Sequence, residues 1–453
     1  MSVVAVTGAS GFVGRAVVAA LAARGDRVIA LGRTAAPQGL PAGVESRRFD
    51  PNEATPNPEA FEGADAVVHL SGESVAGRWT SEKKGRILDS RALGTNNLIA
   101  SLAACSKRPS VLVSASAVGY YGSRGDEPLF ETSAPGKDFL ADVVVRWEAA
   151  ADQAEALGIR TVCLRSAIVL GNGGALEQMK LPFLFCAGGP LGSGRQFVPW
   201  IHLDDMVALY LFALDHEKLR GPINAVAPDY ATNARFGQAL GAALARPALL
   251  PAPAFALRAV LGEFAETILG SQLVIPAVAE DAGFQWSYPY LESAFAQIFN
   301  RPRSAQVRIF RGSQVVPRPV DEVFAFFSSP RNLERITPPI LRFKVRSESG
   351  PLERGTIYDY TISLRGIPMR WKTLIAEVVP RERFVDVQLH GPYALWRHVH
   401  TFRQVEGGVE IDDAVDYLLP FAPIGDLAGP FVRSDVEEIF RFRKRAIAEA
   451  FGS

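Results

Sequence analysis

The sequence predicts an α/β fold, with a doubly wound parallel sheet first and a smaller α+β domain after it. Three observations predict this order. The short apolar run VVAV at 3–6 leads directly into a glycine-rich turn and then into a helical pattern of apolar residues. Strand-like and helix-like segments then alternate as far as residue 166, which is typical of a parallel sheet. Beyond residue 304 the pattern changes to stretches of alternating polarity and one long final helix.

The length and composition of the chain limit the classes of protein to which it can belong. The chain has 453 residues, which is too many for one core, so two or three domains are expected. It is 48% hydrophobic and 21% charged with zero net charge, which favours a soluble protein whose partners are neither nucleic acids nor membrane surfaces. Three widely spaced cysteines favour a reduced, cytoplasmic setting. We see no apolar run long enough to span a bilayer, and the early glycine turn leaves no room for a signal peptide.

The first motif is TGASGFVG at 7–14, between the strand at 3–6 and the helix that follows. Glycines at 8, 11 and 14 allow a tight turn and let the backbone approach a pyrophosphate, while the helix N-terminus supplies amide donors and positive potential. A second predicted strand, RVIALGR at 27–33, completes a βαβ unit, which is the context that this motif requires. The motif therefore predicts a nucleotide-binding turn, and a turn that serves packing alone is the alternative.

The end of the second predicted strand indicates which dinucleotide is bound. An NAD-binding unit usually carries Asp or Glu there, to accept a hydrogen bond from the ribose 2′-hydroxyl. Here the positions are Gly32 and Arg33. A carboxylate would repel a 2′-phosphate, whereas a guanidinium can bind it through two hydrogen bonds. The sequence therefore favours NADP(H) over NAD(H), and a solvated arginine at a strand end is the alternative.

Four more strands are predicted, at VESRRFD, DAVVHLSGE, SVLVSASA and IRTVCLRS, with helical segments between them. In a doubly wound sheet, ligands bind at the carboxyl ends of the strands. The residues at these ends are Asp50, Leu70, Ser71, Gly72, Glu73, Ser114, Ser116 and Arg165.

Several segments match a known family in order and spacing over residues 1–300. They include TGASGFVG, HLSGES, DSR, SASAVGYYG, WEAAA, LRSAIVLGNGGAL, GGPLGSGRQFVPWIHLDD and NAVAPDYATNARF. In these the chain resembles the epimerase-like, atypical branch of the short-chain dehydrogenase/reductase superfamily, which has an NAD(P)-binding Rossmann fold. The resemblance implies NADP(H) as cofactor and a small substrate lobe within residues 166–300. The candidate cofactor-binding residues are Thr7, Gly8, Ser10, Gly11, Phe12, Val13, Arg33, Asp50, Leu70, Ser71, Gly72, Glu73, Arg91, Ser114 and Arg165.

Hydride-transferring members of that superfamily use serine, tyrosine and lysine, with the last two spaced Y-x-x-x-K. Ser116 stands where the serine is expected, but the positions expected for tyrosine and lysine hold Leu140 and Val144. This departure puts the usual proton transfer in doubt. Tyr120 or Tyr121 could act as the acid, so Ser116 and Tyr120 are the candidate catalytic residues. The alternative is that both tyrosines pack or line the pocket, while Ser116 satisfies backbone groups at the strand end.

The middle segment contributes candidate substrate contacts. Its glycine-rich loops GNGGAL and GGPLGSGRQFVPWIH suit an anionic or polyhydroxyl substrate, with Arg195 as the basic group. Tyr121, Arg195 and Trp200 are the candidate substrate-binding residues. Core packing is the alternative for Trp200, and Asp204 is predicted to be the N-cap of the following helix.

A second domain, 301–453, is predicted after the short polar linker NRPRSAQ at 300–306. A strand, one or two amphipathic helices, five stretches of alternating polarity and a long helix predict a curved sheet that wraps around this helix and encloses an apolar cavity. The segments PVDEVFAFFSSPRNLERITPP, WRHVHTFRQVEGG and DAVDYLLPFAPIG resemble the helix-grip superfamily of START-like, polyketide-cyclase and lipid-transfer (SRPBCC) domains. This resemblance implies that the cavity holds a hydrophobic small molecule.

His398 and His400 lie two apart on one predicted strand, and so on one face of it together with Trp396 and Phe402. Two histidines without a neighbouring acidic or thiol ligand make a poor metal site, so no metal is predicted. The last helix carries basic residues that are expected on its solvated face: Arg441, Arg443, Lys444 and Arg445.

Taken together, these features favour an enzyme, an NADP(H)-dependent oxidoreductase or isomerase on a small substrate that is hydrophobic or nucleotide-linked. The fused hydrophobic-ligand-binding domain would raise the local concentration of that substrate. The missing Tyr–Lys pair leaves a second interpretation open, a catalytically silent protein that senses NADPH and binds a ligand. The sequence does not indicate the substrate, the ligand of the cavity or the oligomeric state.

Overall fold

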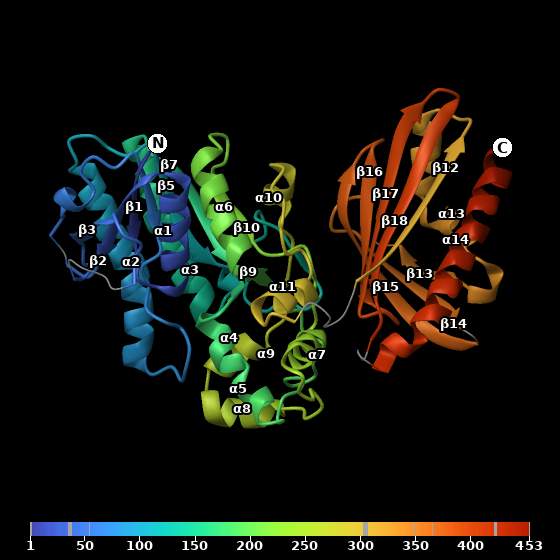
Figure 1. The fold of residues 1–453 in the computed structure, drawn as a ribbon, viewed down its shortest axis with the longest axis horizontal. Coiled ribbons are helices and arrows are strands. Elements are labelled where there is room, and N and C mark those ends of the chain that lie inside the picture. Colours follow the sequence, from blue (N-terminus) through green and yellow to red (C-terminus); the bar gives the residue numbers. More distant parts are fainter. Residues whose placement is uncertain are drawn as a thin grey trace. The chain divides into compact units, whose positions relative to one another are not determined.

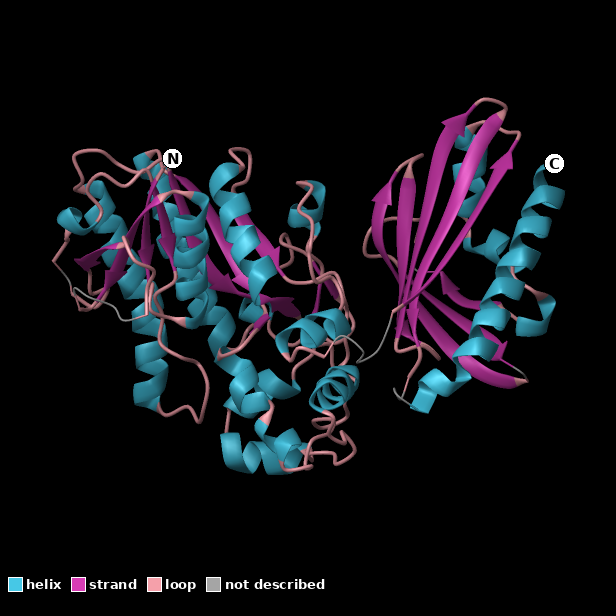
Figure 2. Ribbon diagram, viewed as in Figure 1, coloured by secondary structure: helices cyan, strands magenta, loops and turns pink. Residues whose placement is uncertain are grey.

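The computed structural model describes residues 2–34, 39–53, 55–301, 307–348, 350–364, 366–420 and 424–452. The chain forms two compact units, Met1–Pro302 and Arg303–Ser453, each with its own large sheet (Figures 1 and 2). Most of the expected linker at 300–306 lies outside the described residues. In the described part of the chain, none of the helices combines the length and the apolar character needed to cross a lipid bilayer.

A seven-stranded parallel sheet forms the centre of the first unit, in the order β10-β7-β5-β4-β1-β2-β3. Its strands are β1 (Val3–Thr7), β2 (Arg27–Gly32), β3 (Glu45–Arg48), β4 (Ala66–His69), β5 (Val111–Ala117), β7 (Arg160–Ser166) and β10 (Gly221–Ala225). The order of the strands reverses between β1 and β4, so the carboxyl ends of these two strands border the crevice in which doubly wound sheets bind ligands. The predicted doubly wound fold is confirmed.

Helices cover both faces of this sheet, because successive strand residues point to opposite sides. Val4 and Val6 of β1 pack with residues of α1 and α6, whereas Ala5 between them packs with residues of α2. The helices on the sheet are α1 (Phe12–Arg24), α2 (Ser81–Ala103), α3 (Phe139–Asp152) and α6 (Leu203–Asp215). Gly25 ends α1, since it follows the helix in the left-handed conformation with a φ of 90°.

Short elements outside the large sheet complete the first unit, and most of them follow β7. The strands β6 (Pro128–Leu129) and β11 (Leu273–Val274) pair in parallel, as do β8 (Ile168–Leu170) and β9 (Trp200–His202). The remaining described helices of the first unit are α4 (Gly174–Met179), α5 (Leu181–Leu184), α7 (Asn233–Leu244), α8 (Ala254–Leu261), α9 (Phe264–Leu269), α10 (Ala277–Asp281) and α11 (Leu291–Ile298), with 3₁₀ turns η1 (Pro58–Ala60), η2 (Val118–Tyr121) and η3 (Gln153–Leu157).

The predicted cap of α6 is wrong. His202, not Asp204, is the N-cap residue, because its Nδ1 accepts a 3.1 Å hydrogen bond from the amide of Asp204. The next residue, Asp205, is buried and accepts hydrogen bonds of 2.7 and 3.0 Å from the amides of Ser287 and Tyr288. This carboxylate therefore anchors the last segment of the first unit to the start of α6.

A seven-stranded antiparallel sheet forms the second unit, in the order β12-β18-β17-β16-β15-β14-β13. Its strands are β12 (Arg308–Val316), β13 (Lys344–Glu348), β14 (Ile357–Leu364), β15 (Ile367–Val379), β16 (Arg383–His390), β17 (Leu395–Val405) and β18 (Gly408–Leu418). Its helices are α12 (Val320–Phe327), α13 (Pro330–Arg335) and α14 (Gly429–Phe451), with 3₁₀ turns η4 (Pro339–Leu341) and η5 (Ile424–Ala428). Val436 and Phe440 of α14 pack against Trp396, Val415 and Tyr417 of the sheet, which confirms the predicted helix-grip arrangement.

Candidate functional site

The glycine turn lies at the carboxyl end of β1, where the chain enters α1. Gly8 has a φ of 64°, and a Cβ built on it would lie 2.8 Å from the carbonyl carbon of Leu70. A Cβ on Gly14 would lie 2.1 Å from the carbonyl oxygen of Gly8. Gly11 is the N-cap of α1, and its amide donates a 2.9 Å hydrogen bond to that same oxygen. The turn is therefore packed tightly against the loop after β4, and the amides that follow in the first turn of α1 are available to an anion.

Phe12 joins this turn to the second glycine-rich loop. A Cβ on Gly173 would lie 2.8 Å from Cδ2 of its ring, and a Cβ on Gly174 would lie 2.8 Å from Cδ1. Side chains at these two positions would collide with the ring, which explains why GNGGAL is rich in glycine. Among the other candidate residues of the turn, Ser10 and Gly11 are exposed and Val13 is half-buried.

Behind the turn, buried side chains tie β1 to β4 and α2. The Thr7 hydroxyl accepts a 3.1 Å hydrogen bond from the amide of Leu70 and lies 2.7 Å from His69 Nδ1. His69 Nε2 lies 3.0 Å from the hydroxyl of Thr95. Burial lowers the pKa of His69 to about 4, so the ring is neutral and we place its proton on Nε2, facing Thr95. The Thr7 side chain therefore makes hydrogen bonds inside the protein. Nothing in the sequence indicates that His69 is its partner.

The candidate arginine for a 2′-phosphate lies at a neighbouring strand end. Arg33 follows β2 directly and is exposed. Because β2 pairs with β1, Arg33 and the glycine turn lie at adjacent strand ends of one edge. Asp50, after β3, accepts hydrogen bonds from the backbone amide and the side-chain amide of Asn52, at 3.0 and 3.1 Å, and so shapes the local turn.

The loop of Leu70, Ser71, Gly72 and Glu73 is held from α2. Arg91 Nη1 donates a 2.9 Å hydrogen bond to the Glu73 carbonyl, and a Cβ on Gly72 would lie 3.3 Å from the Arg91 Cζ. Arg91 also lies over the ring of Trp147, with Cζ 5.0 Å from the ring centre, and burial lowers its pKa to about 10. The Glu73 carboxylate forms a 2.7 Å ion pair with Lys83. Arg91 therefore fixes the backbone of a loop that borders the crevice.

Ser116 and Arg165 meet at one buried carboxylate. The Ser116 hydroxyl donates a 2.5 Å hydrogen bond to Glu148 Oε1. Arg165 binds both oxygens of Glu148, at 2.8 Å from Nε to Oε1 and 2.7 Å from Nη2 to Oε2. Only 3% of the Arg165 side chain is exposed. Both side chains therefore bind Glu148 inside the fold, whereas the sequence assigned Ser116 to catalysis and Arg165 to the cofactor. Ser114 is likewise buried and donates to the carbonyl of Ala115.

The two tyrosines of η2 have different surroundings. Tyr121 is fully buried, accepts a 2.9 Å hydrogen bond from Arg165 Nη1 and donates a 2.6 Å hydrogen bond to Asn224 Oδ1. The expectation that Tyr121 contacts substrate is therefore wrong. Tyr120 is half-buried, and the Arg165 guanidinium lies 3.5 Å from the centre of its ring. Of the pair, only Tyr120 presents surface to the surroundings.

Apolar residues occupy the positions where a Tyr–Lys pair is expected. A Cβ on Gly119 would lie 3.4 Å from Leu140 Cβ and 3.9 Å from Val144 Cγ2. These two residues of α3 therefore pack against the turn that carries Tyr120. Hydrophobic contact replaces a proton-transferring pair at this point.

The remaining substrate candidates differ in exposure. Trp200 has 0% of its surface exposed and packs in a core cluster with Phe236 and Phe295, so its assignment as a substrate contact is wrong. Arg195 is exposed. The alternative of core packing for Trp200, which the sequence left open, is the one that the structure shows.

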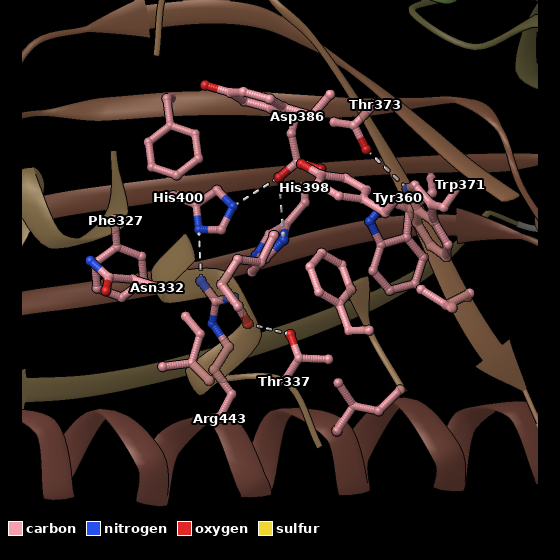
Figure 3. Close-up of a pocket in the computed structure, with 18 of the residues that line it drawn as sticks. Phe327, Asn332, Thr337, Tyr360, Trp371, Thr373, Asp386, His398, His400 and Arg443 are labelled. Carbon is pink, nitrogen blue, oxygen red and sulfur yellow. Dashed lines mark hydrogen bonds and ion pairs between the residues drawn. The ribbon is translucent and has the colours of Figure 1, made fainter. Parts of the chain in front are cut away.

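The second unit contains a cavity of about 190 Å³ between its sheet, α13 and α14 (Figure 3). Most of its lining is apolar or aromatic. The lining side chains include Phe327, Leu333, Ile336, Tyr360, Ile362, Trp371, Ile375, Phe384, Trp396, Ile439 and Phe440. The shape and chemistry suit a small hydrophobic molecule.

A polar cluster interrupts this apolar wall. His398 and His400 point to the same side of β17 and lie beside two carboxylates, from Asp386 on β16 and Asp413 on β18. The prediction that the histidines lack an acidic neighbour is therefore wrong. Arg443 of α14 is buried and reaches the same cluster, with Nη2 3.2 Å from His400 Nδ1, so its placement on a solvated face is also wrong (Figure 3).

The buried groups of this cluster shift one another's pKa values. Burial alone would raise the pKa of Asp413, but Arg443 and the two histidines hold it well below its usual value. Burial likewise opposes ionisation of Asp386, and the hydrogen bond from His400 keeps the pKa of this carboxyl low. Burial lowers the pKa of His398 to about 4. Both aspartates are thus ionised at neutral pH, while the His398 ring is neutral.

Comparison with protein-family models assigns three parts of the chain. Residues 4–225 match the NAD-dependent epimerase/dehydratase family. Residues 252–298 match a domain of unknown function, and residues 316–442 match the family of polyketide cyclase/dehydrase and lipid-transport proteins.

Similar proteins match the first two thirds of the chain. An epimerase family protein of Arabidopsis thaliana, a chloroplastic SDR39U1 homologue, is 39% identical over 300 residues, which are 65% of this chain and 86% of that protein. The human epimerase family protein SDR39U1, crystallised with NADPH, is 35% identical and aligns with a TM-score of 0.59 over 66% of this chain and 99% of its own. The nucleoside-diphosphate sugar epimerase of Corynebacterium glutamicum is 34% identical, with a TM-score of 0.53 over 66% of this chain and 58% of its own.

Proposed function

The chain belongs to the NAD-dependent epimerase/dehydratase family, and from this premise we propose that its first unit binds NADP(H) and is an oxidoreductase or isomerase. The substrate is a small molecule, hydrophobic or nucleotide-linked. The glycine turn carries this proposal, because Gly8, Gly11 and Gly14 let the first amides of α1 approach a pyrophosphate.

Two observations support NADP(H) rather than NAD(H). Arg33 is exposed at the strand end where NAD-binding units carry a carboxylate, and it lies next to the glycine turn. The similar human protein was crystallised with NADPH. We therefore assign the 2′-phosphate to Arg33 and the pyrophosphate to the turn at 8–13.

Tyr120 is our candidate for proton transfer. It lies at the carboxyl end of β5, one strand away from β4 and its loop, and its ring is half-buried beneath Arg165. Ser116 acts indirectly, since its hydrogen bond to Glu148 helps to position Arg165. Arg195, exposed on a glycine-rich loop, is the candidate for an anionic group of the substrate.

We propose that the cavity of the second unit holds a hydrophobic ligand that is the substrate of the first unit or a precursor of it. The apolar lining and the match to lipid-transport proteins support this role. Covalent fusion raises the effective concentration of a ligand released from the cavity near the dinucleotide site.

One observation favours a second candidate function. Leu140 and Val144 pack where a Tyr–Lys pair would transfer protons, which suits a protein that binds NADPH without turnover. Such a protein would report NADPH occupancy to a partner and carry its ligand in the second unit.

Turnover separates the two functions. The full chain is loaded with NADPH and mixed with a panel of carbonyl compounds while the fluorescence of the bound cofactor is followed. An enzyme oxidises NADPH with at least one class of compound, and Tyr120→Phe slows this reaction, whereas the control Tyr288→Phe does not. Bound NADPH that stays inert towards the whole panel, in both the wild type and Tyr120→Phe, would establish the sensor instead. Native mass spectrometry of the protein as purified would identify co-purified ligands of both units.

A further inference from the structure

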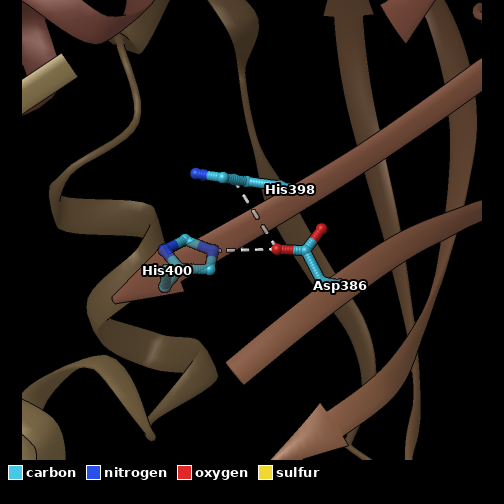
Figure 4. Close-up of side chains that lie close together, drawn as sticks. All are labelled: Asp386, His398 and His400. Carbon is cyan, nitrogen blue, oxygen red and sulfur yellow. Dashed lines mark hydrogen bonds and ion pairs between the residues drawn. The ribbon is translucent and has the colours of Figure 1, made fainter. Parts of the chain in front are cut away.

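Three side chains of the second unit converge on one point of its cavity wall. Asp386 Oδ2 lies 2.9 Å from His400 Nε2 and 3.6 Å from His398 Nδ1 (Figure 4). One ligand atom from each of the three residues lies within 4.8 Å of the others. We propose that Asp386, His398 and His400 bind one divalent transition-metal ion of the zinc class. This site goes beyond the proposed function, and its test needs neither cofactor nor substrate.

The distances from the carboxylate oxygen to the two imidazole nitrogens suit such an ion. Metal–nitrogen and metal–oxygen bonds of about 2.0–2.2 Å, at angles between octahedral and tetrahedral, put two ligands about 2.9–3.5 Å apart. The two distances to Asp386 Oδ2 match this range to within a few tenths of an ångström. Two imidazoles and one carboxylate are also the ligand set that zinc and iron(II) accept in sites with open positions.

A second carboxylate orients both imidazoles. Asp413 Oδ1 lies 2.8 Å from His398 Nε2 and 3.1 Å from His400 Nδ1, on the far side of each ring from Asp386. A proton on His398 Nε2 donates to Asp413 and leaves the lone pair of Nδ1 directed towards Asp386. Carboxylates that accept the outer proton of a ligating histidine are a regular part of metal sites, because they fix the tautomer and the orientation of the ring.

A hydrogen bond from Arg443 holds the His400 ring in this position when no ion is bound. Arg443 Nη2 donates to His400 Nδ1 at 3.2 Å, while the proton on His400 Nε2 faces Asp386. When the ion takes Nε2, that proton moves to Nδ1 and is accepted by Asp413. Arg443 Nη2 remains beside Asp413 Oδ1, at 3.5 Å. No proton leaves the cluster, so the site requires a change of tautomer and only small movements.

The net charge of the cluster and its position on the cavity wall indicate which ligand fills the remaining coordination positions of the ion. The two carboxylates and the guanidinium sum to one negative charge, which a divalent ion converts to one positive charge. An anionic oxygen therefore balances the site. Asp386, His398 and His400 all line the cavity, so the open coordination positions face the bound molecule (Figure 3). A hydroxide, or a carboxylate or enolate oxygen at the end of a hydrophobic ligand, fills them.

Zinc itself is the probe for the test. The full chain is stripped with a chelator and titrated with zinc chloride in a calorimeter. We expect one zinc ion per chain, with the affinity lowered at least tenfold in Asp386→Asn and in His400→Gln. Asp413→Asn lowers the affinity about 10- to 100-fold through the orientation of the rings. The matched control is Asp412→Asn, which changes the neighbouring residue on the opposite side of β18.

X-ray absorption of zinc bound to the wild type decides the case even if a variant fails to fold. The expected spectrum contains two imidazoles and light oxygen or nitrogen ligands at about 2.0–2.1 Å, without sulfur. Less than one zinc ion per chain at saturation would overturn the proposal. So would unchanged affinity in a folded Asp386→Asn variant, or a spectrum that shows sulfur or fewer than two imidazoles.

Discussion

The carbonyl oxygen of Gly8 lies where a side chain on Gly14 would begin, since a Cβ built on Gly14 would be only 2.1 Å from it. An alanine there forces the turn and α1 apart. We expect Gly14→Ala to destabilise the protein by about 2–3 kcal/mol and to abolish the fluorescence of bound NADPH. Urea unfolding measures the first effect and cofactor titration the second.

Gly85→Ala is the control for that substitution. A Cβ on Gly85 meets no atom within 4 Å, and Gly85 lies inside α2, where alanine is the better helix former. The control should leave NADPH binding unchanged and stabilise the protein slightly. Equal behaviour of the two variants would mean that the glycine turn is not the cofactor site.

Arg33→Ala tests which dinucleotide the first unit prefers. Loss of the guanidinium should weaken NADPH binding at least tenfold and leave NADH binding nearly unchanged, because only NADPH carries the 2′-phosphate. Fluorescence titration with each cofactor gives both constants. Arg48→Ala, on the neighbouring strand β3 and paired with Glu53, is the control and should change neither. Equal losses for the two cofactors in Arg33→Ala would show that Arg33 does not recognise the phosphate.

Glu148→Gln should destabilise the protein much more than the loss of an exposed ion pair on the same helix does. Glu148 binds the buried Arg165 through both oxygens, and removing its charge leaves that guanidinium without its ion-pair partner. We expect a loss of about 3–5 kcal/mol in the free energy of unfolding. Asp142→Asn on the same helix breaks an exposed ion pair with Arg146 and should cost less than about 1 kcal/mol. A cost as small as that of the control would contradict the structural role of Glu148.

Acid should destabilise the first unit through His69. Burial lowers the pKa of His69 from 6.5 to about 4, so between these values the unfolded chain binds a proton that the folded protein does not. Stability should therefore fall as the pH drops from 6.5 to 4, by up to about 3 kcal/mol from this residue. Above pH 7 the contribution of His69 does not change with pH.

Urea unfolding of wild type and His69→Gln at several pH values isolates this effect from other groups that titrate in the same range. The difference in stability between the two proteins should shrink as the pH falls. A constant difference for His69→Gln would show that His69 is not held neutral by burial.

Much of the fold could be predicted because local patterns agreed with the tertiary structure. The alternation of strands and helices, the glycines of the first turn and the polarity of the last strands each carried their own signal, and both family resemblances are confirmed by the comparisons. The strand β13 carried no such signal. Its sequence KVRSE has one apolar residue, because β13 is an edge strand that pairs on one side only.

The polar cluster of the second unit could not be predicted for a different reason. Asp386 and Asp413 are more than ten residues from the histidines in sequence, and they meet them through the register of three strands. Asp386 pairs with His398 across β16 and β17, and His400 pairs with Asp413 across β17 and β18. Two β-bulges in the pairing of β15 with β16 show that register in this sheet is not fixed by alternation alone. Only the folded sheet brings these groups together.

The first described strand of the second unit, β12, can pair only after the last described strand, β18, has been synthesised. β12 pairs along its whole length with β18, about a hundred residues further on, and lies at the edge of the sheet. When β12 leaves the ribosome, its partner β18 has not yet been synthesised, whereas every strand of the first sheet is already available for pairing. The dinucleotide-binding unit can therefore finish folding on the nascent chain, whereas the ligand cavity can close only after β18 and α14 have been synthesised.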